Sequence, residues 1–324
     1  EPDDPDSLFE DLDRVIVPGV SHFQHPRYFA FFPANAGLAS VLGDLTSSGL
    51  GVLGLNWEAA PALTEVEELT CDWMRELLGL APEWRGSIYD TAPTASPVAA
   101  ICARERASDF ALARGGIRDG EPLTMYASAQ SHSSVAKAVL MAGIGREHLR
   151  LVEVDGDYRM DADALALAMA EDRRAGRRPA AVFATVGATG TASIDPVAEI
   201  VECAREHGAW VHVDAALAGS AMLLEECRPL WRGVDGADSV SLNPHKWLAT
   251  TFDCSLFYVR DVEHLVRVMS TNPSYLKTHR AEEVTQLRDC AVPLGRGAGA
   301  MAPGSQLRLD GGAALRAGLR RAPH

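Results

Sequence analysis

Residues 238–260 read DSVSLNPHKWLATTFDCSLFYVR, and they place a lysine, Lys246, between two apolar segments that have the composition of strands. The segments 238–243 and 254–259 are rich in residues that favour β-structure and are short enough to be buried strands. A charged amine in such surroundings is costly unless it is paired or neutralised. Two explanations of Lys246 are open at this point, a structural ion pair and a reactive amine.

The middle of the chain alternates short apolar segments with amphipathic helices. Strand-like segments occupy residues 123–128, 149–154, 180–186 and 209–216, and helical periodicity covers residues 132–143, 160–176 and 195–208. In the last helix we expect Asp195 at the cap, Pro196 at the first position and Gly208 at the end. This alternation predicts an α/β fold with a mostly parallel sheet that helices cover on both faces.

The segments outside this alternation have weaker patterns. Residues 1–20 predict one amphipathic helix, and residues 63–79 predict a second helix that ends at Gly79. Residues 86–107 are interpreted as a turn, a polar stretch and then a helix. Residues 297–324 are rich in Gly, Ala and Arg, so we expect a poorly ordered tail with one short helix near residues 313–321.

Composition and charge exclude several classes of function. The 324 residues carry a net charge of −14, which disfavours binding to nucleic acids or to anionic membranes. The six cysteines form no C-x-x-C pair, so we expect reduced thiols in a cytoplasmic protein and no metal site. No apolar segment is long enough to span a membrane, and no signal peptide opens the sequence.

Polar residues follow three of the predicted strands. Thr189 lies beyond the strand of residues 180–186, Asp214 ends the next one, and Lys246 follows the strand of residues 238–243. Ligands bind at the carboxyl ends of strands in open α/β sheets, so these three side chains are expected to converge on one pocket. A desolvated lysine can react with an aldehyde, and a carboxylate can keep a pyridine nitrogen protonated. The pair therefore suits pyridoxal phosphate (PLP), with a buried Asp–Lys ion pair as the alternative.

Two further features admit both a functional and a structural interpretation. His132 lies at a strand-to-helix junction, where it either stacks on a cofactor ring or serves as a cap or core residue. The small residues that open the helix within residues 86–107 fit an anion site, although Ser, Thr and Pro begin many helices. His212 is interpreted as a packing residue because no second metal ligand lies near it in the sequence.

These motifs together resemble the group II PLP-dependent decarboxylases, the family of aromatic-L-amino-acid decarboxylase. The resemblance covers about residues 8 to 296. It is carried by NPHKW with the following FDCS, by HVDAA followed by AGSA, by HSSVAKA, and by the N-terminal segments HPRYFAFFPAN and PALTEVEELTCDWM. The lysine signature NPHKW is the most specific of them.

The resemblance implies a role for each matching residue. Lys246 would be the Schiff-base lysine, Asp214 would contact the ring nitrogen, His132 would stack over the ring, and Tyr275 would return a proton to the reacting carbon. The remaining matches are cofactor contacts at Thr189, Asn243, His245, Ala92 and Pro93, and a substrate wall of Phe31, Phe32, Pro33 and Ala34 together with His132. Two positions depart from the family pattern, because Pro93 replaces a phosphate-binding serine and Ala34 replaces a threonine.

The resemblance also implies a fold and an assembly. The fold would be PLP fold type I, the aspartate-aminotransferase type, with a mostly parallel seven-stranded sheet in a homodimer that has its sites at the interface. We expect an N-terminal segment at residues 1–60 that contributes to embracing the partner, a PLP-binding large domain at residues 61–296, and an atypical, truncated tail at residues 297–324.

The expected reaction is decarboxylation of an L-amino acid, most simply an aromatic one, to the amine and CO2 through a Schiff base on Lys246. Two alternatives stay open: an aldehyde synthase or another reaction on the same scaffold, and a chain that folds without turnover. Pro93 and the short C-terminal segment motivate the second alternative. The sequence does not identify which amino acid is the substrate.

Overall fold

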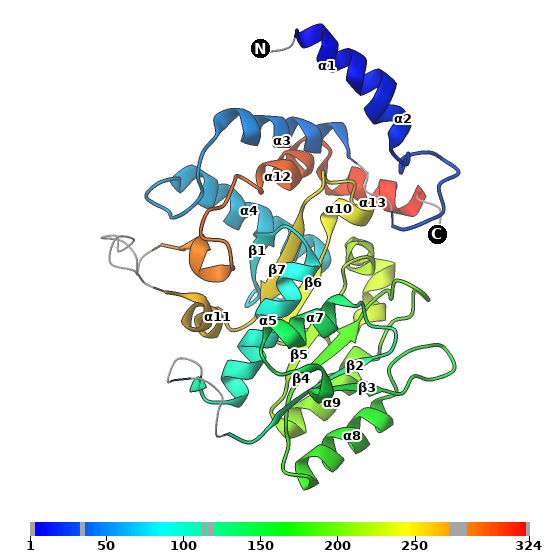
Figure 1. Ribbon diagram of the computed structural model, residues 1–324, viewed down its shortest axis with the longest axis vertical. Helices are drawn as coiled ribbons and strands as arrows, with labels where there is room; N and C mark the ends of the chain where they lie inside the picture. The colour runs from blue at the N-terminus through cyan, green and yellow to red at the C-terminus, as the bar shows by residue number, and fades with distance from the viewer. Residues whose placement is uncertain (1–3, 33–35, 112–114, 116–119, 272–283, 322–324) are drawn as a thin grey trace.

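A mixed sheet organises the computed structural model, which describes residues 4–32, 36–111, 115, 120–271 and 284–321. Among these residues the sheet has seven strands in the order β1-β7-β6-β5-β4-β2-β3 (Figure 1). The strands are β1 (Arg85–Tyr89), β2 (Leu123–Ser128), β3 (Leu149–Val152), β4 (Arg178–Thr185), β5 (Trp210–Asp214), β6 (Ser239–Leu242) and β7 (Ser255–Val259). Strands β3, β2, β4, β5 and β6 are parallel, and β7 pairs antiparallel with both β6 and β1. The predicted mostly parallel seven-stranded sheet is therefore confirmed.

Strand β1 was not predicted, because residues 86–107 were interpreted as a turn and a polar stretch before the helix. Gly86 in this strand lies so close to its neighbours that a Cβ atom there would be 2.6 Å from the Tyr258 ring and 2.8 Å from Cys71. Glycine weakens an isolated strand but allows close packing. Pairing with β7 and packing against the helix that contains Cys71 therefore create a strand that local sequence does not favour.

Helices cover both faces of the sheet, as the alternation predicted (Figure 1). One face packs against α4 (Pro61–Leu78), α8 (Ala162–Arg174) and α9 (Val197–His207), and the other against α5 (Ala92–Ala107), α7 (Ser134–Met141) and α11 (Val262–Met269). Strand β4 shows the alternation, because Val182 and Ala184 belong to the first core and Ala181 and Phe183 to the second.

Short helical segments fill the connections between these elements. They are η2 (Arg146–His148), η3 (Ala218–Leu223), η4 (Glu225–Trp231), η5 (Val234–Gly236), α10 (Pro244–Trp247) and η7 (Leu287–Cys290). The predicted caps of the long helices are confirmed at Gly79 and Gly208, which end α4 and α9 with positive φ angles of 74° and 66°. Asp161 caps α8 by accepting hydrogen bonds from two backbone N–H groups, as expected for an N-cap aspartate.

Asp195 has a different role from the predicted helix cap. The N-cap of α9 is Pro196, and the Asp195 carboxylate instead accepts hydrogen bonds from the backbone N–H groups of Met160 and Thr185, each at 2.7 Å. Burial raises the pKa of Asp195 to about 6, and the two N–H donors oppose that rise. The carboxylate thus connects the end of β4 to the turn before α8.

The segment from residue 297 contains more structure than the predicted tail. Helices α12 (Met301–Leu309) and α13 (Gly311–Arg321) follow each other, and only the second corresponds to the expected short helix. Helix α12 lies against α3 (Leu38–Leu50) so closely that a Cβ atom on Gly43 would be 2.2 Å from the Met301 carbonyl oxygen (Figure 1). The small residues that argued against order allow this close packing of two helices.

The predicted N-terminal helix is present and projects from the remainder of the molecule (Figure 1). It consists of α1 (Pro5–Asp11), a π-helical segment at Leu12–Ile16 and α2 (Val17–Gly19), and none of these residues is buried. No helix within the described residues is long and apolar enough to cross a membrane. The same described ranges contain no group of three or more His, Cys, Asp or Glu side chains arranged to hold a metal ion.

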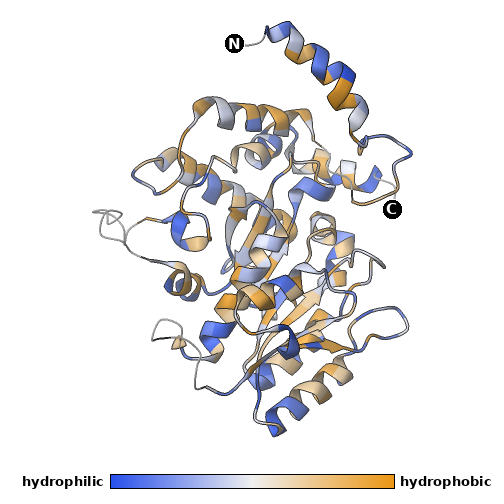
Figure 2. Cartoon of the chain, viewed as in Figure 1, coloured by the Kyte–Doolittle hydropathy of each residue, from blue (hydrophilic) through white to orange (hydrophobic). Residues whose placement is uncertain are grey.

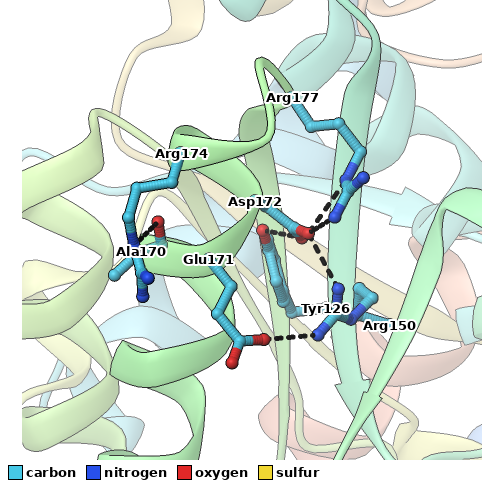
Figure 3. Close-up of polar contacts among 7 residues, drawn as sticks. All are labelled: Tyr126, Arg150, Ala170, Glu171, Asp172, Arg174 and Arg177. Atoms are coloured by element: carbon cyan, nitrogen blue, oxygen red, sulfur yellow. Dashed lines mark hydrogen bonds and ion pairs between the residues drawn. The ribbon is translucent and has the colours of Figure 1, made fainter.

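One buried carboxylate holds the β2–β3 edge of the sheet together (Figure 3). Asp172 in α8 is fully buried and accepts hydrogen bonds from the Tyr126 hydroxyl at 2.6 Å, from Arg150 at 2.8 Å and from Arg177 at 2.6 Å. The neighbouring Glu171 contacts the same Arg150 at 3.3 Å from the exposed side. The network connects α8 to β2, β3 and the turn that leads into β4.

Replacing Asp172 with asparagine is expected to lower the free energy of unfolding by about 3 kcal/mol, the low end for breaking a buried pair. The low end applies because the side chains of Arg150 and Arg177 are 35% exposed and can turn toward water. Denaturant unfolding of the two proteins measures the difference. Glu171→Gln is the matched control and should change stability by about 0.5 kcal/mol or less; equal losses in both variants would contradict the assignment.

Candidate active site

A cavity of 210 Å³ lies at the carboxyl ends of β4, β5 and β6. Nine of the predicted site residues line it: Phe32, Ala92, Pro93, His132, Thr189, Asp214, Asn243, His245 and Lys246. They come from six separate parts of the chain, so the convergence that strand topology predicted is a property of this fold.

The rest of the predicted substrate wall does not reach this cavity or cannot be placed. Phe31 is absent from the lining, and its side chain is 83% exposed on a backbone with a φ angle of 57°. The left-handed turn at Phe31 directs Phe31 and Phe32 to different surroundings, so the role of Phe31 in the substrate wall stays a prediction. Pro33, Ala34 and Tyr275 lie outside the described residues.

Lys246 is partly buried in the short helix α10, directly after β6. Burial lowers the pKa of its amine, and the negative charge of Asp214 partly offsets this effect. The amine lies 5.1 Å from the centre of the Phe32 ring. Lys246 and Asp214 line one cavity but do not form an ion pair within 4.0 Å, so the structural ion-pair alternative does not describe these two residues.

Asp214 is the last residue of β5 and is 5% exposed. The backbone N–H of Ala216 donates to its Oδ1 atom at 3.1 Å, which fixes the carboxylate toward the cavity mouth. His212, two residues earlier on the same side of the strand, is held between Ser239 at 2.9 Å and Ser241 at 3.3 Å. Burial lowers the pKa of His212 to about 4, so this ring is neutral at pH 7 and adds no positive charge beside Asp214.

His132 lines the cavity from the turn before α7. The backbone N–H of Ser134 donates to its Nδ1 atom at 3.2 Å, and the Ser134 hydroxyl lies 2.8 Å from the same nitrogen. A neutral ring with Nδ1 as the acceptor carries its proton on Nε2. The local turn therefore fixes both the ring position and the tautomer.

The start of α5 supplies a backbone donor to the cavity. The first N–H groups of a helix have no partner inside it, and here the amides of Thr94 and Ala95 bond to the Thr91 carbonyl oxygen. Pro93 has no N–H, so the amide of Ala92 is the donor left at this helix end. Thr91 also lines the cavity, whereas the Ser96 hydroxyl donates back to the Ala92 carbonyl oxygen at 3.1 Å.

Asn243 and His245 complete the polar lining between β6 and α10. The side-chain oxygen of Asn243 is buried and has no hydrogen-bond partner within the described part of the chain. Buried polar atoms are nearly always paired, so an unpaired atom in a cavity wall indicates a place for a ligand. The backbone N–H of Cys254 donates to Nδ1 of His245 at 3.0 Å, and burial, assisted by the charge of Lys246, lowers the pKa of His245 to about 4.

These groups fit PLP better than they fit a metal or an isolated anion. The cavity combines an amine of lowered pKa, a buried carboxylate, a helix N–H, an unpaired amide and a histidine of fixed tautomer. An aldehyde, a pyridine nitrogen and a phosphate are the groups that such a set can bind.

Sequence reasoning missed several lining residues because their types carry no specific signal. They are Ser134, Thr185, Gly187, Ala216, Leu217 and Phe252. Among these residues, Gly187 has a structural reason to be glycine, because its φ angle is 86° and a Cβ atom there would lie 2.6 Å from the Cβ atom of Ala218. This close approach brings the turn after β4 against the turn after β5.

Two distant segments hold the loop that follows Lys246. The Gln306 side chain in α12 donates to the Leu248 carbonyl oxygen at 2.6 Å and accepts from the Thr250 hydroxyl at 2.8 Å. From the other side, the backbone N–H of Gly37 donates to the Ala249 carbonyl oxygen at 2.7 Å. Ala249 has a φ angle of 55°, a conformation that needs such support. We call residues 248–250 and these partners the Lys246 clamp.

Comparison with known proteins shows one consistent similarity. The model of the pyridoxal-dependent decarboxylase conserved domain matches residues 1–322. Tryptophan decarboxylase 2 from Oryza sativa subsp. japonica is 38% identical over 334 residues, which covers 100% of this chain and 66% of that protein. Phenylacetaldehyde synthase from Arabidopsis thaliana is 38% identical, with 98% and 67% covered.

The fold comparison agrees with the sequence comparison. The crystal structure of Oryza sativa TDC with PLP and tryptamine is 37% identical and superposes with a TM-score of 0.94, covering 98% of this chain and 67% of that chain. The chain thus spans about two thirds of the length of the relatives that it matches. The expected fold type I architecture is confirmed by this similarity.

The lowered pKa of Lys246 can be measured by acetylation of the apoprotein at a series of pH values, followed by peptide mass spectrometry. Lys246 should become reactive at a lower pH than an ordinary lysine, because burial disfavours its charged form. Asp214→Asn should shift the midpoint further down, because the Asp214 charge raises the pKa of Lys246. Exposed Lys137 is the internal reference, and a midpoint unchanged by Asp214→Asn would contradict the coupling.

Gln306→Ala should disturb Lys246 through the Lys246 clamp. The variant leaves two buried groups unpaired and should lose about 2–4 kcal/mol of stability, since each costs about 1–3 kcal/mol. It should also shift the pH midpoint of Lys246 acetylation, which a purely structural role would not change. Arg308→Ala, an exposed position on the same helix, is the control; a loss of stability with an unchanged midpoint would reduce Gln306 to a packing residue.

Proposed function

Because this chain belongs to the family of pyridoxal-dependent decarboxylases, we propose that it binds PLP at Lys246 and removes the α-carboxyl group of an aromatic L-amino acid. The observation that carries the proposal is the cavity in which Lys246 and Asp214 lie together without forming an ion pair. A lysine of lowered pKa that shares a cavity with a buried carboxylate, without pairing with it, is typical of a reactive amine and not of a stabilising ion pair.

We assign the cofactor contacts from the lining of the cavity. Lys246 would hold the aldehyde carbon, Asp214 the ring nitrogen, and His132 one face of the ring. Thr189 would lie beside the ring, and the phosphate would be bound by the Ala92 N–H together with Asn243, His245 and the neighbourhood of Pro93. When bound, the cofactor supplies a protonated ring that accepts the electrons of the broken bond.

The residues of this chain prepare that chemistry. Burial favours the neutral amine of Lys246, which is the form that attacks a carbonyl group. Neutral His212 adds no positive charge next to Asp214, and a carboxylate held in a fixed position would stabilise a protonated ring nitrogen. His132 holds its proton at Nε2, where it can meet the substrate carboxylate.

An aromatic substrate is supported by two features. The rings of Phe32 and Phe252 line the cavity beside Lys246, and apolar rings select for apolar side chains. The relatives are named tryptophan decarboxylase and phenylacetaldehyde synthase, and both tryptophan and phenylacetaldehyde contain an aromatic ring. Tyr275, which we propose as the proton donor to the reacting carbon, lies outside the described residues, so its role remains a sequence-based prediction.

We further propose a cytoplasmic homodimer with sites near the interface. Apolar side chains are exposed along the projecting N-terminal helix and along α3, including Leu8, Phe9, Val15 and Leu45, each more than 60% exposed. Figure 2 shows hydrophobic positions along both of these helices. A second copy would remove this surface from water. All six cysteines are free thiols, which supports a reducing compartment. A monomeric mass in analytical ultracentrifugation would contradict the dimer.

Product analysis tests the proposed reaction. Purified protein with PLP should absorb visible light, borohydride should fix the cofactor on Lys246, and an aromatic L-amino acid should yield an amine and CO2. Lys246→Ala should lose the fixed cofactor and nearly all turnover, while Lys137→Ala, on an exposed face of α7, should retain both. Aldehyde, ammonia and CO2 as products would support the aldehyde synthase, and cofactor fixation without any product would contradict the proposed decarboxylation.

A further inference from the structure

A second cavity, of 450 Å³, lies at the edge of the sheet opposite the candidate active site. It is bordered by the starts of β5 and β6, the end of β7, and the last turns of α5 and α9. Its charged lining residues are Arg106, Arg205, Arg260 and Asp238. Three positive charges against one negative charge leave a net charge of +2 in the lining, although the whole chain carries a net charge of −14.

The single acidic residue of this cavity, Asp238, already accepts hydrogen bonds from Arg106 and from a backbone amide. Asp238 accepts two hydrogen bonds from Arg106, at 2.7 and 3.1 Å, and a third from the backbone N–H of Val211 at 2.7 Å. The Arg106 guanidinium also lies 4.6 Å from the centre of the Trp210 ring. Arg106 is therefore fixed in the cavity wall, and none of the three hydrogen bonds that Asp238 accepts comes from the other two arginines.

Arg205 and Arg260 have no side-chain ion pair or hydrogen bond with any residue that the structure describes. A Cβ atom on Gly236, across the wall, would lie 3.5 Å from a terminal nitrogen of Arg205, so this guanidinium reaches the cavity wall although the residue is exposed to solvent. Arg205 is in the last turn of α9, where the helix dipole favours a cation.

The helix dipole does not explain Arg260. This residue immediately precedes Asp261, the N-cap of α11, and the N-terminal end of a helix disfavours positive charge. Three guanidinium groups that border one hollow also repel one another, and the repulsion is relieved when an anion enters. Arginine is the side chain best suited to bind phosphate, because its planar fork donates two parallel hydrogen bonds.

We propose that this cavity binds a small phosphate monoester, whose charge of about −2 at neutral pH matches the net charge of the lining. Arg205 and Arg260 would contact the phosphate, and Arg106 would be held beside it by Asp238 and Trp210. A cavity of 450 Å³ is of the size that accommodates small molecules. The proposal is independent of the reaction at Lys246, because the two cavities share no lining residue.

The test uses the PLP-treated protein with inorganic phosphate and glycerol phosphate as probes, at constant ionic strength. Calorimetry should give a dissociation constant that Arg205→Gln and Arg260→Gln each weaken about tenfold or more, the value of one charge-assisted hydrogen bond. Arg173→Gln, at a partly exposed arginine of α8 that pairs with Glu121, should leave the constant unchanged. Thermal unfolding of each variant verifies that it is folded.

A residue-specific measurement separates this cavity from the phosphate-binding groups of the candidate active site. Phosphate should slow the modification of Arg205 and Arg260 by phenylglyoxal in proportion to occupancy and should not slow that of Arg173, as read by peptide mass spectrometry. Equal slowing at all three arginines, or an unchanged dissociation constant in the double variant, would overturn the site. Equally tight binding of succinate would overturn the assignment to phosphate.

Discussion

The desolvation of one amine is the constraint on which the site depends. Lys246 is buried enough for its pKa to fall, while Asp214 lies close enough to oppose that fall and yet does not pair with it. Here β5 and β6 are adjacent parallel strands, so Asp214 ends one strand and Lys246 follows the end of the next. The sheet therefore brings the two residues to one cavity, and the Lys246 clamp holds the loop that follows the lysine.

The main part of the fold could be predicted because buried strands and amphipathic helices have strong local patterns. Residues 123–128, 180–186 and 254–259 are short segments rich in apolar and β-forming residues, which are typical of strands that are covered on both faces. Strand β1 could not be predicted, since Gly86 lacks intrinsic preference for a strand and its strand depends on a close neighbour. Helix α12 could not be predicted either, because it packs where Gly43 of α3 leaves room for it. Both exceptions are places where a missing side chain allows another element to approach, which is information about tertiary contacts and not about local sequence.

The residues of the candidate site also divide into those that local sequence indicates and those that only tertiary contacts place. Lys246, Asp214 and His132 could be proposed because ligands bind at the carboxyl ends of parallel strands, and ionisable side chains are unusual next to such buried strands. Thr185, Leu217 and Phe252 carry no such signal, and their place in the lining follows from the turns that connect the strands. The exposure of Phe31 could not be foreseen, because the pattern FF gives no indication that Phe31 has a positive φ angle. The neutrality of His212 was also inaccessible, since it depends on complete burial between two serine hydroxyls.

The two ends of β5 illustrate how a parallel sheet separates opposite electrostatic tasks. At its carboxyl end, Asp214 faces a cavity to which α5 presents the N–H group of Ala92 at its N-terminus, so the helix end itself favours an anionic group there. At its amino end, Trp210 and Val211 adjoin the last turns of α5 and α9, where the helix dipoles disfavour anions. An anion site at that end must be built from side chains, and guanidinium groups supply the required charge without the risk of deprotonation. The three arginines around the second cavity are thus the arrangement that this edge of the sheet would need, whereas the cavity at the other edge has a helix N-terminus and a single lysine.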